Sequence, residues 1–120
     1  MQVVFITGGS TGIGKATGAL LESTGYKVIG TSRSPELYKD HPFPLVQMDL
    51  HDASSIEKAV QTVISQHGQI DVLINNAGKG IVGPVEETPV EEIRKAFETN
   101  LVGAIAVMQA VLPIMRERNK

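Results

Sequence analysis

The chain has 120 residues, a formal net charge of −2 and no cysteine. This length is enough for one hydrophobic core, and we expect a single domain over residues 1–120. Without a basic excess to neutralise phosphates, a nucleic-acid partner is not expected. The lack of cysteine excludes disulfides and thiolate ligands, and His41, His51 and His67 have no metal-ligand spacing, so we expect no metal.

The sequence does not predict a targeting or membrane-spanning segment. Strand-like sequence begins almost at Met1, which leaves no room for a signal peptide. The most apolar stretch, Leu101–Met115, is interrupted by Gly103 and Pro113. It is shorter than the roughly 20 apolar residues that cross a bilayer. We therefore expect a cytoplasmic protein without a membrane partner.

Four short runs predict β-strands, and each is nearly continuous in apolar residues, as is typical of parallel strands covered on both faces. The runs are Gln2–Thr7, Lys27–Thr31, Leu45–Asp49 and Asp71–Asn76. Helical patterns alternate with them, and the helices are expected over Gly12–Thr24, over Ala53–Gln66 after the N-cap residue Asp52, and from Val90 onward. This alternation predicts an α/β fold with a parallel sheet and helices on both faces.

The apolar spacing also predicts which helix faces are buried. The expected inward side of the first helix consists of Ile13, Ala16, Ala19 and Leu20. The last helix is apolar all round and should be buried on more than one side. One stripe, which includes Phe97, Leu101 and Val111, is expected to cover the sheet. The opposite stripe is expected to need another partner and consists of Val102, Ala106, Val107, Ala110 and Ile114. Pro113 is expected to kink or end this helix.

The loop "TGGSTGIG", Thr7–Gly14, places four glycines between the first strand and the first helix. A helix N-terminus presents free N–H groups and a partial positive charge, which makes it an anion site. Glycine lets the backbone approach a ligand closely because no Cβ stands in the way. The loop therefore predicts a nucleotide phosphate site. The alternative is a tight strand-to-helix turn without a ligand.

Two kinds of nucleotide site compete for this loop. The segment "GSTGIGKA", Gly9–Ala16, nearly matches the G-x-x-x-x-G-K-[ST] loop of nucleotide triphosphatases. It fails at Ala16, where a hydroxyl should bind magnesium, and Gln47 interrupts the strand that should supply a second magnesium ligand. The other interpretation is a dinucleotide fold, in which glycines at the first strand–helix turn hold the pyrophosphate.

Four motifs in register favour the second interpretation. "TGGSTGIG" resembles the T-G-x-x-x-G-x-G signature of the short-chain dehydrogenase/reductase family, and "MDL", "NNAG" and "FETNLVGA" follow in the family's order. The resemblance covers the whole chain. It implies a Rossmann-type doubly wound sheet of four parallel strands in the order 3-2-1-4, stopping before a fifth strand. It also implies hydride transfer between a nicotinamide dinucleotide and an alcohol/carbonyl pair.

The resemblance assigns roles to particular residues. Those expected at the phosphates are Gly8, Ser10, Thr11, Gly12, Ile13 and Gly14. Asp49 is expected to accept from the adenine amino group beside the N–H of Leu50, although an Asp before a helix also serves simply as a turn residue. The ribose side is expected to be lined by Asn75, Ala77 and Gly78.

The residues after the second strand predict which dinucleotide is bound. An acidic residue there holds the ribose hydroxyls of NAD, whereas Arg accommodates the 2′-phosphate of NADP. The position is filled by Ser32 and Arg33, and the nearest acid, Glu36, lies beyond Pro35. Guanidinium pairs strongly with phosphate. We therefore expect NADP(H) to be favoured over NAD(H), unless Arg33 is merely a solvated loop residue.

The catalytic Tyr-x-x-x-Lys pair of the family is not found in these 120 residues. Tyr26 is followed four positions later by Gly30, and Tyr38 by Pro42. The resemblance leaves Asn100 as the one catalytic-site residue, expected within the buried stripe at a bend of the helix. We therefore expect the cofactor-binding portion of an oxidoreductase, inactive alone. The competing interpretation is a non-catalytic nucleotide-binding or interaction module.

Self-association is also expected, from two features. The strand Asp71–Asn76 should lie at the sheet edge, where unpaired N–H and C=O groups invite another chain. The stripe of the last helix that contains Val107 should pack in a dimer. We expect Val107→Glu to dissociate such a dimer without disturbing cofactor binding.

Overall fold

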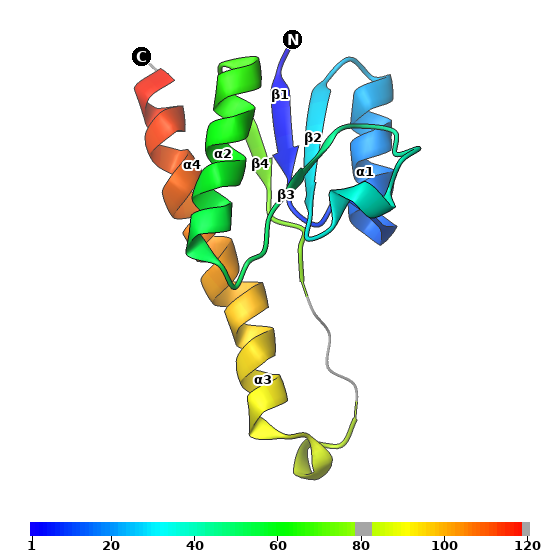
Figure 1. The fold of residues 1–120 in the computed structure, drawn as a ribbon, viewed down its shortest axis with the longest axis vertical. Coiled ribbons are helices and arrows are strands. Elements are labelled where there is room, and N and C mark those ends of the chain that lie inside the picture. The colour runs from blue at the N-terminus through cyan, green and yellow to red at the C-terminus, as the bar shows by residue number, and fades with distance from the viewer. Residues whose placement is uncertain (79–82, 119–120) are drawn as a thin grey trace.

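The computed structural model describes residues 1–78 and 83–118, which form one parallel sheet flanked by helices (Figure 1). The strands are β1 (Val3–Ile6), β2 (Lys27–Ser32), β3 (Leu45–Gln47) and β4 (Val72–Ile74). They pair in parallel in the order β3-β2-β1-β4, which confirms the predicted order. β4 pairs only with β1, so it is an edge strand of this sheet.

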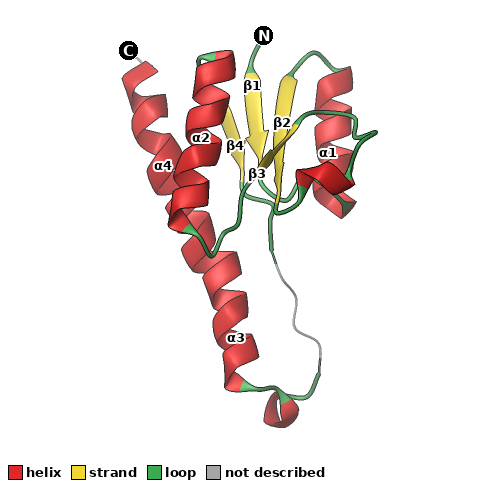
Figure 2. Ribbon diagram, viewed as in Figure 1, coloured by secondary structure: helices red, strands yellow, loops and turns green. Residues whose placement is uncertain are grey.

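The helices cover the two faces of the sheet unequally (Figure 2). The main helices are α1 (Gly12–Ser23), α2 (Ala53–His67), α3 (Val90–Phe97) and α4 (Ala104–Arg118). Short helical segments also occur: η1 (Pro35–Leu37), η2 (Val85–Glu87) and the π-helical η3 (Glu98–Gly103). α2 and α4 pack on one face and α1 on the other, as the doubly wound prediction requires.

The larger core lies between the sheet and the α2 and α4 helices. Alternate strand residues such as Phe5 and Ile29 point into it, and α2 contributes Ile56 and Val63. Asp52 is the N-cap of α2, as predicted, and its side chain accepts from the N–H of Ser54. The pKa of Asp52 is lowered, mainly by the hydrogen bond that its carboxylate accepts from the Ser54 side chain.

The smaller core lies under α1, and here the predicted helix face is wrong. Ile13 and Leu20 are 79% and 65% exposed, whereas Gly14 and Gly18 are the buried residues of α1. A Cβ added to Gly18 would lie 2.3 Å from the ring of Phe43. The ring also approaches glycines of the loop and of β2, so α1 lies close to the sheet through its glycines and this aromatic side chain.

The long C-terminal helix turns residues from both predicted stripes to the core. Val107 and Val111 are fully buried, and Ala106, Ala110 and Ile114 pack against the same cluster. Of the stripe expected to cover the sheet, Val111 is buried as predicted, but Phe97 and Leu101 are exposed, at 60% and 52%. Pro113 lies inside α4, which continues to Arg118, so it does not end the helix.

The α3, η3 and α4 segments form one helical stretch, Val90–Arg118, of 29 residues. In the part of the chain that the structure describes, this is the one helix whose length and hydropathy are sufficient to cross a membrane. The expectation that the apolar segment is too short is therefore wrong. A single such helix is weak evidence for a membrane span, because core helices of soluble proteins pass the same test.

Candidate functional site

The glycine loop forms a tight turn at the end of β1. Gly8 has a φ of +66°, and a Cβ there would lie 2.8 Å from Cα of Ala77. Gly12 has a φ of +57° and open space where a Cβ would be. Both values lie in the left-handed region that favours glycine. The loop therefore brings backbone, and not side chains, to the surface where α1 begins.

The N-terminus of α1 is open to an anion. The N-cap residue Thr11 makes no side-chain capping bond, and the first turn contains no acidic residue. The first N–H groups of a helix have no partner within the helix itself. Together with the space at Gly12, this arrangement fits a phosphate group held by backbone N–H groups.

The side chains of two buried threonines hold the glycine loop in place by hydrogen bonds. Oγ1 of Thr7 accepts from the N–H groups of Asn76 and Ala77, each at 3.1 Å. The side-chain amide of Asn76 donates to O of Gly8 at 3.0 Å. On the other side, Oγ1 of Thr31 accepts from the N–H of Gly8 at 3.1 Å. The loop is thus held between β2 and the segment after β4.

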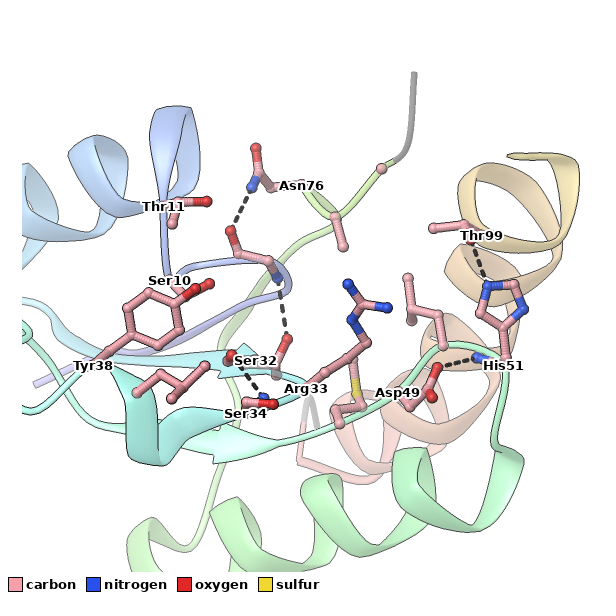
Figure 3. Close-up of a pocket in the computed structure, with 17 residues that line it drawn as sticks. Ser10, Thr11, Ser32, Arg33, Ser34, Tyr38, Asp49, His51, Asn76 and Thr99 are labelled. Atoms are coloured by element: carbon pink, nitrogen blue, oxygen red, sulfur yellow. Dashed lines mark hydrogen bonds between the residues drawn. The ribbon is translucent and has the colours of Figure 1, made fainter. Parts of the chain in front are cut away.

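A cavity of about 620 Å³ opens at the carboxyl ends of the four strands (Figure 3). This is where doubly wound sheets bind ligands, and the volume is within the range of ligand pockets. The cavity is lined by Gly8, Ser10, Thr11, Thr31, Ser32, Arg33, Ser34, Leu37, Tyr38, Met48, Asp49, Leu50, His51, Asn76, Ala77, Gly78 and Thr99.

Most of the residues predicted for the cofactor line this cavity. The structure brings together Gly8, Ser10, Thr11, Ser32, Arg33, Asp49, Leu50, Ala77 and Gly78. Gly12, Ile13 and Gly14 are not among the lining residues and form the first turn of α1 beside it. Asn75 is exposed and also lies outside the lining, and its amide donates to O of Ala104 at 3.4 Å.

Arg33 extends into the cavity between Asn76 and Asp49 (Figure 3). Among the described residues, its guanidinium makes neither an ion pair nor a hydrogen bond. The preceding residue is held in place, because Oγ of Ser32 accepts from the N–H of Ser34 at 3.1 Å. An exposed cation therefore stands at the end of β2, where the dinucleotide fold meets the ribose.

Asp49 forms the turn before α2 and also lines the cavity. Its Oδ1 accepts from the N–H of His51 at 2.9 Å, and its own N–H donates to Oγ of Ser55. These bonds form the turn before α2. The same residue lines the cavity next to Leu50, so the turn presents the carboxylate to a ligand.

The sequence interpretation missed several lining residues. Thr31 and Asn76 were overlooked because their role is to bond the backbone of the glycine loop, which no motif spacing reveals. His51 and Thr99 bond each other at 2.8 Å, Nε2 to Oγ1, although 48 positions separate them in the chain (Figure 3). That bond joins the loop after β3 to the π-helical segment.

Asn100 is exposed, which corrects the expectation that it lies in a buried stripe. It lies within η3, so the predicted irregularity of the helix at this residue is present as a π-helical turn. Such turns are frequent at functional sites. A Cβ on Gly78 would lie 3.1 Å from Oδ1 of Asn100, which places this amide at the mouth of the site.

No group of three or more potential metal ligands stands together in the described residues. The polar groups that line the cavity are hydroxyls, the Asn76 amide, the Arg33 guanidinium, the His51 imidazole and the Asp49 carboxylate. Such groups suit a phosphorylated polar ligand better than a metal-centred reaction.

The geometry agrees with comparisons with known proteins. The family model for the short chain dehydrogenases matches residues 2–120. The curated 3-ketodihydrosphingosine reductase of Bacteroides thetaiotaomicron is 41% identical over 119 residues, which are 99% of this chain and 44% of that protein. The oxidoreductase BOA17 of Botryotinia fuckeliana is 37% identical over 98% of this chain and 45% of its own.

Solved structures give the same result. A short-chain dehydrogenase from Streptomyces avermitilis superposes with a TM-score of 0.86 at 36% identity, over 98% of this chain and 45% of its own. Serine dehydrogenase from Escherichia coli superposes with a TM-score of 0.86 at 30% identity, over 98% of this chain and 58% of its own. The chain thus spans less than half the length of these curated relatives. Its motifs, sheet order and family match together show that it belongs to the short-chain dehydrogenase/reductase family.

Proposed function

We propose that this chain is the NADP(H)-binding portion of a short-chain dehydrogenase/reductase whose reaction is hydride transfer between NADP(H) and an alcohol/carbonyl pair. The family's fold binds nicotinamide dinucleotides. The observation that carries the choice of NADP(H) is Arg33, which extends into the cavity at the end of β2. An acidic residue would be needed there to hold the ribose hydroxyls of NAD.

Each part of the cavity has a role in this proposal. The N–H groups of the first turn of α1, with the hydroxyls of Ser10 and Thr11, hold the pyrophosphate. Arg33 and Ser32 hold the 2′-phosphate through charge-assisted hydrogen bonds. The carboxylate of Asp49 accepts from the adenine amino group. When bound, the dinucleotide supplies the nicotinamide ring that carries the hydride.

The proposal separates binding from turnover. General acid–base help is typically worth about 10²–10⁴-fold in rate, and the Tyr/Lys pair that supplies it in the family is not among these 120 residues. Asn100, at the mouth of the cavity, is the residue of this chain assigned to the catalytic side. Binding of NADP(H) is therefore the property that these residues can provide by themselves.

Calorimetric titration of the protein with NADPH and with NADH tests the proposal. We expect NADPH to bind more tightly, and Arg33→Ala to weaken NADPH by about 1–3 kcal/mol while NADH changes little. Lys39→Ala is the matched control, because it removes a positive charge from the same connection at a residue that does not line the cavity. Equal affinities for the two dinucleotides, or a preference for NADH, would contradict the proposal.

Self-association is part of the same proposal, but on a different helix face from the one expected. The exposed apolar side chains of the long helix are Val90, Phe97, Leu101, Val102, Ile105 and Leu112, here called the outer stripe. Large exposed apolar patches mark interaction sites, and these side chains are candidates for such a patch. The outer stripe takes the role assigned earlier to the Val107 face, and the edge strand β4 is a second surface for pairing.

A further inference from the structure

Thr31 is a buried residue of β2 that holds two successive amides of the glycine loop. Its Oγ1 accepts from the N–H of Gly8 at 3.1 Å, and its backbone O accepts from the N–H of Gly9 at 3.2 Å. The side chain is 2% exposed. Without the hydroxyl, the N–H of Gly8 would lose the acceptor that Thr31 provides.

Sheet pairing and hydrogen bonds hold the backbone from Thr31 to Arg33 in place. Thr31 is paired with Val46 in the sheet. The next residue, Ser32, accepts at its O from the N–H of Met48 at 2.9 Å and at its Oγ from the N–H of Ser34 at 3.1 Å. Arg33 follows and extends into the cavity (Figure 3). The position of the Arg33 backbone relative to the glycine loop therefore depends on how the loop packs against Thr31.

The other side of the loop is held independently. The amide of Asn76 donates to O of Gly8 at 3.0 Å, and Gly8 lies against the backbone of Ala77. Removing the Thr31 hydroxyl would leave these contacts in place. The loss of the hydroxyl would remove one of the two hydrogen bonds between the loop and Thr31, without detaching the loop from the segment after β4.

From these contacts we propose that Thr31 is a positioning residue for cofactor specificity. Its hydroxyl sets the distance between the glycine loop and Arg33, so that one ligand places its pyrophosphate on the loop and its 2′-phosphate on the guanidinium. This inference rests on the proposed function and adds to it a specificity determinant that acts through Gly8 and Arg33.

The test is Thr31→Val, which keeps the size of the side chain and removes the hydroxyl. For the Thr31→Val protein, we expect the ratio of NADPH affinity to NADH affinity to fall about tenfold relative to the wild type, as expected for the loss of one hydrogen bond. NADH has no 2′-phosphate and should be affected less. Thr31→Ser retains the hydroxyl and should keep the wild-type ratio. In an Arg33→Ala background, Thr31→Val should leave the ratio unchanged, because interacting residues are not additive.

Val63→Ala is the control for a purely structural effect, because it weakens the core between the sheet and α2 at a residue that does not line the cavity, and it should leave the ratio unchanged. Titrations are made at a temperature where melting curves show every variant folded. An equal loss of both affinities in Thr31→Val, or a Thr31→Ser protein that behaves like Thr31→Val, would overturn the role of the hydroxyl. A wild-type protein that does not prefer NADPH would overturn the proposed function, and the role of Thr31 with it.

Discussion

The two faces of the sheet are built by different means. On the face covered by α2 and α4, the core cluster contains eleven buried residues among those described, and most are branched aliphatic side chains. On the face covered by α1, the corresponding cluster contains four, and the buried residues of the helix are Gly14 and Gly18, which lie against Asn76 and Phe43. One face is stabilised mainly by apolar burial and the other by close approach of the backbone.

The difference reflects what each face does. The start of α1 must lie over the end of β1, where its first N–H groups can reach a ligand, and bulky side chains would push it away. Phe43 fills the remaining space, and its ring lies against Gly9, Gly18 and Gly30. The face beside the site therefore has fewer buried apolar side chains, and the α1 backbone lies closer to its neighbours there.

The largest expected effect comes from charging the larger core. Val107→Glu would bury a carboxylate without a partner at a position with no exposure, so we expect a loss of about 4–5 kcal/mol or more in the free energy of unfolding. That is comparable to the whole stability of a small domain. Thermal melting followed by circular dichroism measures it, and the expectation replaces the earlier one of a folded, dissociated dimer.

Ile105→Glu is the matched control, because it adds the same charge two residues away on the exposed side of α4. We expect it to change stability by about 1 kcal/mol or less. Similar melting temperatures for the two variants would show that the buried and exposed faces have been assigned wrongly.

An intermediate effect is expected where α1 meets Phe43. Gly18→Ala would place a Cβ 2.3 Å from the buried ring, and such overpacking typically costs about 1–3 kcal/mol. The greater helix propensity of alanine offsets up to about 1 kcal/mol of this cost. Urea denaturation should therefore show a net loss of stability.

The double variant Gly18→Ala with Phe43→Leu supplies the control for that contact. The smaller side chain should relieve the clash and recover part of the stability that Gly18→Ala loses. A stabilised Gly18→Ala protein would mean that propensity outweighs packing, and that α1 does not depend on close contact with Phe43.

The smallest effect on stability, but a clear one on assembly, is expected on the outer stripe. Leu101 is 52% exposed, so Leu101→Glu should leave the melting temperature nearly unchanged. Light scattering over a range of concentrations should show a lower mass for this variant than for the wild type. A wild-type protein that stays a monodisperse monomer at high micromolar concentration would contradict the proposed self-association.

Much of the fold was predictable from local sequence. The four apolar runs identified the strands, because both faces of a parallel sheet are covered and the runs are therefore continuous. Glycine spacing and the "NNAG" segment marked the two loops that meet at the reversal of strand order. Arg33 was predictable as a cavity residue because it directly follows the second strand, at the edge where ligands bind.

Other features depended on the tertiary structure. Periodicity shows that a helix has an apolar face, but in the stretch Val90–Arg118 apolar residues lie all round, so it could not show that Val107 faces the core and Leu101 does not. In α1 the buried residues are glycines, which contribute no hydrophobic signal at all. Thr31 and Asn76 act through hydrogen bonds to Gly8, made by residues 23 and 68 positions away, and only folding brings these groups within bonding distance.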